Sequence, residues 1–263
     1  MVSQSFIIVL TLLGQILTCN SHPVDSFESD PEEFGDYFEG DMDLDDIQRI
    51  ALENQDHRNG VVNESYNWPN NTVYYEISDV FDDEHRNYIL KGISHIEAAS
   101  CLRFYPKDES TPDYIFIIGE NTGCHTKVGY RGGEQTLNLQ IYQLEAGCFR
   151  IGTIMHEILH ALGFHHQHNT PDRDVYITIV PENIRTGKER NFKKNLATDV
   201  TDYGVQYDYA SVMHYRPTAY SRNHNPTIIP KDPDATIGQR LELSEGDIWK
   251  LNRKYNCTDE ILD

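Results

Sequence analysis

The sequence predicts an α/β fold, with a twisted mixed sheet and helices in the N-terminal half and an irregular C-terminal half that ends in a long helix. Three observations indicate this. Short apolar stretches typical of strands flank a helical repeat at 82–99, and a second helical repeat lies at 150–162. Between that repeat and 244–255, the chain has few regular patterns. We expect a cleft between the two halves.

The N-terminal half supplies the predicted sheet and its first helix. Strands are expected near 72–78, 102–105, 113–118 and 136–141. A helix is expected at about 82–99, because an acidic run suits a helix N-terminus and apolar residues then recur at helical spacing. These apolar residues are Tyr88, Ile89, Ile93 and Ile96.

Two further helices are expected downstream. The helix at about 150–162 has one apolar face, formed by Ile151, Ile154, Met155, Ile158 and Leu162. The last helix is expected at 244–255, where Ser244 and Asp247 resemble a capping box.

The chain of 263 residues carries a formal net charge of −20, which is unevenly distributed. Residues 22–58 hold thirteen acidic residues against two arginines, a net charge of −11, and the remainder carries −9. A segment with so many carboxylates and few aromatic residues would be disordered by itself. The acidic balance argues against nucleic acid or an anionic membrane as a partner.

The first residues are expected to form a signal peptide at 1–21. Residues 5–17 are apolar but too few to span a bilayer, and small or polar residues follow them. No later segment is apolar enough to cross a membrane. We therefore expect a secreted, extracellular protein.

Cysteines and glycosylation sequons agree with a secretory route. Five cysteines become four if Cys19 leaves with the signal peptide, and four cysteines allow three pairings. A secreted context favours two disulfides over free thiols. Sequons occur at Asn63, Asn70 and Asn256, and the last has Cys257 at its centre.

The most specific chemical signal is the run His156-Glu157-x-x-His160-x-x-Gly163-x-x-His166. Residues four apart on a helix share a face, so His156 and His160 can bind one ion. Gly163 can adopt the left-handed conformation that ends a helix, and His166 then approaches from a third direction. Three protein ligands leave a position open for water, as catalytic zinc requires.

Glu157 is expected to be the general base. Zinc lowers the pKa of its water to about 7, and Glu157 can take that proton and pass it to the leaving amine, a role worth roughly 10²–10⁴-fold. A chance match of the five fixed positions has odds of roughly one in ten thousand. His165 and His168 are expected to take no part. The pattern therefore predicts one Zn²⁺ per chain and hydrolysis of a peptide bond.

Residues beyond the run identify a family. Asp172-Arg173-Asp174 follows it, and Ser211-Val212-Met213-His214-Tyr215 comes later. With these motifs the chain resembles the astacin family of zinc metalloproteases, in the metzincin group, which implies an α/β zincin fold. The stretches 68–70, 101–104, 123–124, 128–133 and 243–248 are similar to family landmarks in the same order.

The resemblance implies roles for residues outside the run. Met213 would lie beneath the zinc, and Tyr215 would be a switchable zinc ligand that swings off the metal to help stabilise the oxyanion. The segment Phe38-Glu39-Gly40-Asp41 is similar to the inhibitory F-x-G-D motif of the family. Asp41 would therefore ligate zinc in the latent form and displace the catalytic water.

The resemblance also implies two disulfides and a substrate position. The pairs would be Cys101–Cys257 and Cys124–Cys148. An extended substrate would add as a strand to the sheet edge near 125–128 and lie across the zinc.

Two positions depart from the family pattern. Gln167 stands where the family has a glutamate that contacts the new N-terminus after activation, so the charge pairing is lost. Thr170 stands where the family has an arginine. The difference at Gln167 concerns activation and leaves the zinc chemistry intact, whereas nothing in the sequence shows what replaces the contacts of the arginine at Thr170.

The predicted organisation has three segments. A signal peptide at 1–21 precedes an acidic inhibitory propeptide at 22–58 and a catalytic domain at 59–263, with Arg58-Asn59 as a cut for a trypsin-like protease. We expect a monomeric secreted endopeptidase that is made as a zymogen and acts on proteins or peptides.

The alternative function is a catalytically inactive secreted zinc-binding protein. Glu157 and Tyr215 argue against it, because a scaffold needs neither. Two other metzincin branches do not fit. Matrix metalloproteases use a cysteine in their leader, and residues 22–58 contain none. Serralysins carry Gly-Asp calcium repeats, and the chain has none.

Overall fold

The computed structural model describes residues 30–53, 64–195 and 201–257. The predicted signal peptide, the Arg58-Asn59 junction and the Asn63 sequon lie outside the described residues. The helices are α1 (Asp46–Glu53), α2 (Asp83–Ala98), α3 (Ile151–Ala161) and α4 (Glu245–Lys254). The strands are β1 (Met42–Asp43), β2 (Thr72–Ile77), β3 (Arg103–Pro106), β4 (Tyr114–Ile118), β5 (Cys124–Lys127), β6 (Glu134–Leu139), β7 (Ile177–Ile179) and β8 (Ile228–Pro230).

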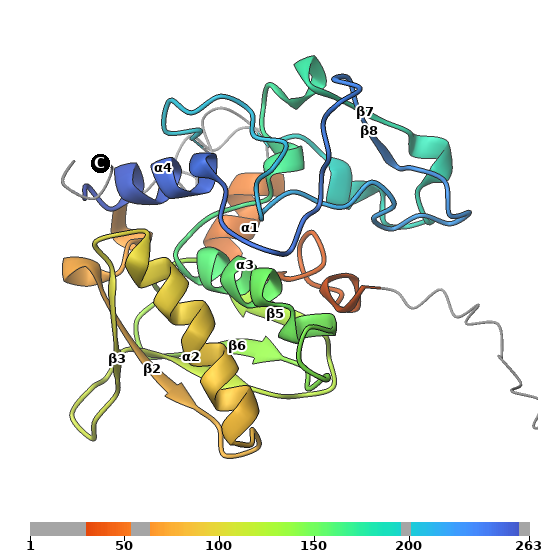
Figure 1. The fold of residues 1–263 in the computed structure, drawn as a ribbon. Helices are drawn as coiled ribbons and strands as arrows, with labels where there is room; N and C mark the ends of the chain where they lie inside the picture. The colour runs from red at the N-terminus through yellow and green to blue at the C-terminus, as the bar shows by residue number, and fades with distance from the viewer. Residues whose placement is uncertain (1–29, 54–63, 196–200, 258–263) are drawn as a thin grey trace, which may run out of the picture.

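A six-stranded mixed sheet forms the N-terminal half, in the order β1-β5-β6-β4-β2-β3 (Figure 1). Only the β5–β6 pair is antiparallel within it. The predicted mixed sheet with helices is confirmed, and β2, β3, β4 and β6 lie close to the predicted ranges. The last of these begins and ends two residues earlier than expected.

Two strands of this sheet were not predicted. Strand β5 has the sequence Cys-His-Thr-Lys, which lacks the apolar alternation of a half-buried strand, although its first three residues are buried. Strand β1 comes from the acidic segment and pairs in parallel with β5, with Met42 opposite Thr126. The described part of the acidic segment, residues 30–53, is therefore docked on the protein, with β1 on the sheet edge, in contrast to the disorder expected of the segment alone.

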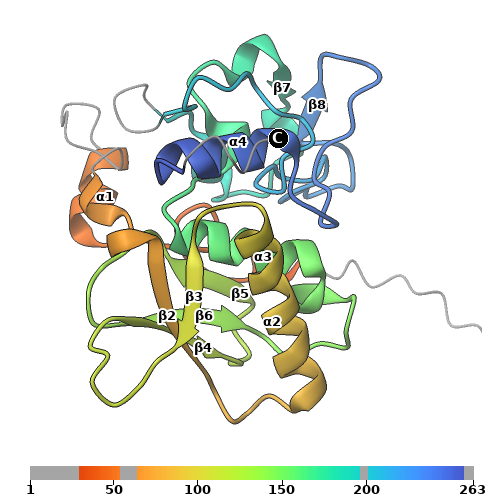
Figure 2. The ribbon, with the colours of Figure 1, turned by 60° about the vertical axis from the view of Figure 1, so that its left-hand side comes forward.

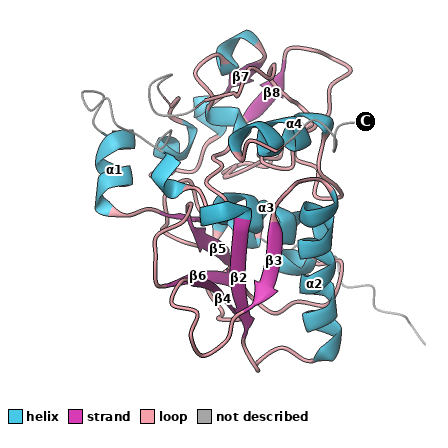
Figure 3. Ribbon diagram, turned by 90° about the vertical axis from the view of Figure 1, so that its left-hand side faces the viewer, coloured by secondary structure: helices cyan, strands magenta, loops and turns pink. Residues whose placement is uncertain are grey.

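The C-terminal half is mostly loops and short 3₁₀ turns (Figure 3). Its β7 and β8 form a separate antiparallel pair that the sequence patterns did not reveal. The capping box predicted at Ser244 and Asp247 begins α4, which has ten residues and is shorter than the sixteen-residue α2.

Helix α3 lies between the two halves (Figure 1). Residues Gly152–Ala161 are all buried, so the helix has no solvent-facing side, contrary to the simple amphipathic pattern expected of it. Helices α2 and α3 approach closely at Gly92, where a Cβ would lie 2.5 Å from Cγ2 of Ile154. At the other end of α3, the indole N–H of Trp68 donates to the Ala161 carbonyl over 2.9 Å.

The docked residues 30–53, which we call the leader, run beside α3 and end in α1 at one side of the molecule (Figure 2). Their α1 end is held by Arg131, which donates to side chains of Asp45 and Gln48. None of the described helices is both long and apolar enough to cross a membrane.

Candidate metal centre

Helix α3 carries the first two histidines and ends directly after them. Its C-terminus is a Schellman motif, because Gly163 N–H donates to the His160 carbonyl (2.8 Å) and Phe164 N–H to the Leu159 carbonyl (3.0 Å). Gly163 has φ +91°, which favours glycine. The sharp turn brings His166 back beside the helix, as the spacing predicts.

The three histidines converge through their Nε2 atoms. His160 Nε2 lies 3.1 Å and His166 Nε2 3.3 Å from Nε2 of His156. Zinc–nitrogen bonds of about 2.0–2.1 Å in a tetrahedron place neighbouring ligand atoms about 3.3 Å apart. Asp41 completes the cluster, since one ligand atom from each of these four buried residues lies within 4.8 Å of the others.

The tautomers of the histidines fit a cation. Nδ1–H of His156 donates to the Val212 carbonyl (2.9 Å) and Nδ1–H of His160 to the Phe164 carbonyl (2.7 Å). A carbonyl oxygen can only accept, so both Nε2 atoms point lone pairs into the cluster and cannot bond to each other. Lone pairs facing each other in a buried site require a positive charge between them.

Acidic residues increase this demand for positive charge. Asp41 Oδ2 lies 3.2 Å from Nε2 of both His156 and His166. Burial lowers the pKa of His166, but the carboxylates of Asp41 and Glu39 outweigh burial and raise that pKa to about 9. Burial lowers the pKa of His156 to about 4. A divalent metal supplies the charge that these groups require, and the donor set of imidazole and carboxylate suits zinc.

Glu157 lies next to the cluster on α3 and is fully buried. Neither of its carboxylate oxygens has a hydrogen-bond partner among the described residues. Burial, with Asp41 nearby, raises the pKa of Glu157 well above its usual range. A carboxylate without partners beside a metal site is suited to exchanging a proton with water.

Met213 and Tyr215 lie in a turn beside the segment of the third histidine. The turn closes with His214 N–H donating to the Ser211 carbonyl (3.1 Å), and Gln167 N–H donates to the Met213 carbonyl (3.0 Å). The ring of Tyr215 lies 4.6 Å from that of His166, centroid to centroid.

His168 makes a contact that the sequence does not predict. It does not join the metal cluster, but its buried ring stacks on Tyr215 with centroids 3.7 Å apart. Its Nε2–H donates to the Asn191 carbonyl over 3.0 Å. His165 is outside the cluster too, as expected. No spacing rule reveals a stacking partner, so this contact was visible only in the fold.

Glu39 is a second site residue that the sequence analysis missed. Its carboxylate accepts from Nδ1–H of His166 over 2.8 Å, and its backbone carbonyl accepts from the hydroxyl of Tyr215. The leader therefore contacts a metal-facing histidine and the tyrosine together, besides placing Asp41. The signal available was the position of Glu39 inside Phe38-Glu39-Gly40-Asp41.

Gln167, which departs from the family pattern, has a charged partner within the chain. The ammonium group of Lys250, on α4, donates to the Gln167 side-chain oxygen, and both residues are buried. At Thr170 the hydroxyl donates to the Gln167 carbonyl over 3.1 Å.

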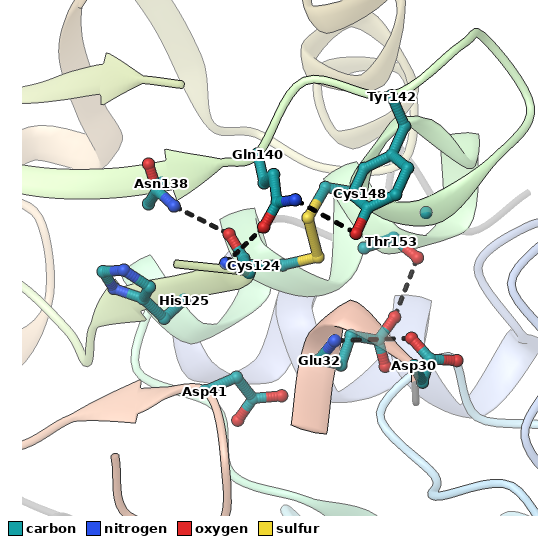
Figure 4. Close-up of a disulfide and its surroundings, with 12 residues drawn as sticks. Asp30, Glu32, Asp41, Cys124, His125, Asn138, Gln140, Tyr142, Cys148 and Thr153 are labelled. Atoms are coloured by element: carbon teal, nitrogen blue, oxygen red, sulfur yellow. Dashed lines mark hydrogen bonds between the residues drawn. A yellow bond between two sulfur atoms is a disulfide. The ribbon is translucent and has the colours of Figure 1, made fainter. Parts of the chain in front are cut away.

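Two disulfides join distant parts of the chain. The disulfides are Cys101–Cys257 and Cys124–Cys148, the pairs that the resemblance implies. The second joins β5 to the segment before α3 (Figure 4). The sequon residues Asn70 and Asn256 are both exposed.

Comparison with known proteins finds relatives that match most of the chain. The model of the Astacin peptidase family matches residues 60–256. Seminal metalloprotease 1 of Drosophila melanogaster is 45% identical over 237 residues, covering 88% of this chain and 91% of that protein. The beta subunit of human meprin A is 37% identical over 230 residues, covering 86% of this chain but 30% of that protein.

A solved structure shares the fold. The high choriolytic enzyme 1 of the medaka fish Oryzias latipes, a hatching enzyme zinc-protease, superimposes with a TM-score of 0.66 at 33% sequence identity. The match covers 73% of this chain and 94% of that one.

Proposed function

Since the chain belongs to the astacin family and is an astacin-like zinc metalloendopeptidase, we propose that it is a secreted enzyme made as a zymogen and that Glu157 is its general base. Proteins or peptides are its substrates. The observation that carries the catalytic proposal is the convergence of three histidine Nε2 atoms beside a carboxylate without partners.

His156, His160 and His166 are the proposed zinc ligands of the active enzyme. A zinc ion held there supplies a Lewis acid that lowers the pKa of water to about 7 and polarises the scissile carbonyl. Val212 and Phe164 keep the two helix histidines in the required tautomer through their carbonyls. Met213 supports the cluster from below.

Glu157 and Tyr215 perform the proton and charge steps in this proposal. Glu157 takes the proton of the attacking water and delivers it to the leaving nitrogen. Tyr215 would be a further, switchable ligand of the metal, and its hydroxyl would donate a hydrogen bond to the oxyanion. Stacking on His168 holds the ring of Tyr215 in a defined orientation.

Latency is assigned to the leader. Asp41 occupies the metal-facing position, and β1 occupies the edge of β5, where an extended substrate would add. We assign 1–21 as signal peptide, 22–58 as propeptide and 59–263 as catalytic domain, with activation by a trypsin-like protease at Arg58-Asn59. The active enzyme would be a monomer with its substrate cleft between the two halves, without nucleic acid or membrane as partners. Asn63, Asn70 and Asn256 are the proposed glycosylation sites.

The test is a Glu157→Gln variant assayed on a fluorogenic peptide after trypsin treatment. We expect a loss of roughly 10²–10⁴-fold in kcat, with zinc content unchanged. Glu120→Gln, at an exposed carboxylate, is the matched control and should retain full activity. Hydrolysis by both the wild type and Glu157→Gln that does not exceed that of trypsin alone would instead support an inactive zinc-binding protein.

A further inference from the structure

The leader makes a second set of contacts away from the metal. Its first described residues include three acidic side chains, Asp30, Glu32 and Glu33, which we call the acidic anchor. They face four arginines of the catalytic part, Arg150, Arg185, Arg216 and Arg240, which we call the arginine cluster. None of these seven residues belongs to the metal cluster.

Glu32 makes the most complete contact of the anchor. Nε of Arg240 donates to its two oxygens over 2.8 and 3.0 Å, and Nη2 of Arg240 donates to Oε2 over 2.5 Å. Thr153, on α3, donates to Oε1 over 2.8 Å (Figure 4). Arg150 also donates to Oε1, over 3.1 Å. The Glu32 and Arg240 side chains are only 8% and 7% exposed. A buried, bidentate, fully paired carboxylate is costly to break on one side.

Asp30 and Glu33 widen the contact on either side. Both oxygens of Asp30 accept from Arg150, over 2.8 and 3.2 Å. Glu33 accepts from Arg216 over 2.6 Å and from Arg185 over 2.9 Å. If the acidic anchor were removed, the four arginines of the cluster would lose these carboxylate partners.

The backbone of the anchor also fits the catalytic part closely. A Cβ on Gly123, at the start of β5, would lie 2.3 Å from the Pro31 carbonyl oxygen. Arg240 in turn donates to the His214 carbonyl over 3.1 Å, within the turn that holds Met213. The anchor therefore binds a surface that adjoins the metal centre, through residues that are not in the metal cluster.

We propose that the acidic anchor and the arginine cluster form a second inhibitory contact, which keeps the leader bound when the ligation of the metal by Asp41 is lost. This inference rests on the proposed zymogen function. It implies that loss of Asp41 alone does not activate the uncut chain, and that a cut leader stays bound without covalent attachment.

The first test compares four variants of the full, uncut chain: Asp41→Ala, Glu32→Gln, the double variant, and Asp36→Asn. Asp36 is the matched control, because it lies in the same segment and its side chain is 96% exposed. Hydrolysis of a fluorogenic peptide is measured relative to the trypsin-activated wild type. We expect each single variant to stay below about a tenth of that activity and the double variant to exceed either by at least tenfold.

The second test needs no variant. The wild-type chain is cut with trypsin, treated with or without EDTA, and passed over a size-exclusion column, and the leader is detected by mass spectrometry. We expect the leader to stay with the catalytic part in EDTA, and to separate in EDTA when Glu32 is replaced by Gln.

Two results would overturn the inference: full activity of uncut Asp41→Ala, or release of the wild-type leader by EDTA. Absence of hydrolysis after proven loss of the leader would contradict the proposed function instead. The retention measurement does not depend on activity, so it still decides the inference in that case.

Discussion

Gly40 shows how one residue decides whether the leader fits. Its φ is +96°, and a Cβ there would lie 1.9 Å from the hydroxyl oxygen of Tyr220 and 2.7 Å from the Glu32 carbonyl oxygen. We expect Gly40→Ala to cost about 1–3 kcal/mol in the docked state, from backbone strain and the clash with Tyr220. The uncut variant should hydrolyse peptide faster than the uncut wild type but stay below about a tenth of the trypsin-activated activity, because Asp41 and the acidic anchor are still present.

The control for Gly40 is Gly187→Ala. Gly187 also has a positive φ, +85°, but a Cβ there would meet nothing within 4 Å. The Gly187→Ala variant should lower the melting temperature without raising the peptide hydrolysis of the uncut chain. If Gly40→Ala keeps the chain as silent as the wild type, close packing at Gly40 is not needed for latency.

At the residue scale, the sequence reveals the residues whose spacing is local. His156, Glu157 and His160 lie on one helix, and a helix end at Gly163 fixes His166. His168 escaped prediction, because its partner Tyr215 is 47 residues away along the chain and no periodicity links a ring to its stacking partner.

At the scale of elements, α4 is tied through Asp247 to the turn that contains Met213. This carboxylate completes the capping box with Ser244 and also accepts from Ser211 Oγ (2.6 Å) and Val212 N–H (2.8 Å). We expect Asp247→Ala to lower the free energy of unfolding by about 3 kcal/mol or more, because it removes a cap and leaves a buried N–H without a partner. Denaturant melts measure this loss, and kcat should fall, because Val212 orients His156.

Asp82→Ala is the matched comparison at the N-terminus of α2. Asp82 accepts from His85 N–H over 2.9 Å but lies on the surface, away from the metal centre. The Asp82→Ala variant should lower the free energy of unfolding by about 0.5–2 kcal/mol, as loss of an exposed cap does, and leave kcat unchanged. Equal effects of the two variants on kcat would show that α4 does not support the turn.

Elements with a clear pattern were predicted and those without one were missed. Helix α2 and strands β2, β3 and β4 follow apolar periodicity, and their bounds fall within a residue or two of the expected ranges. Strands β7 and β8 are only three residues long, too short to show a period, and the four residues of β5 lack apolar alternation. Their pairing depends on distant segments.

For the whole molecule, the two disulfides differ in the length of chain that they close. Cys101–Cys257 spans 156 residues and Cys124–Cys148 spans 24. Loop-closure entropy alone assigns about 5 kcal/mol to the first and about 3.5 kcal/mol to the second. We expect Cys101→Ser with Cys257→Ser to lower the free energy of unfolding more than Cys124→Ser with Cys148→Ser.

Guanidinium melts of the two double variants, monitored by circular dichroism, measure the difference. A greater loss from the shorter loop would mean that local packing around β5, and not chain entropy, dominates the contribution of the disulfides. Zinc content is measured in both variants, so that any loss of metal is separated from the effect of the disulfide.

The sequence by itself determined the His-Glu run, the residue proposed as general base, the family and the main helices and strands, because each depends on motifs that are local in the chain. Only the tertiary structure showed that Glu39 binds His166 and Tyr215, that Lys250 binds Gln167, and that the leader is held by arginines. Glu32 and Arg240 are separated by 208 residues. Which charges meet over such separations is decided by how the whole chain packs, and no local pattern carries that information.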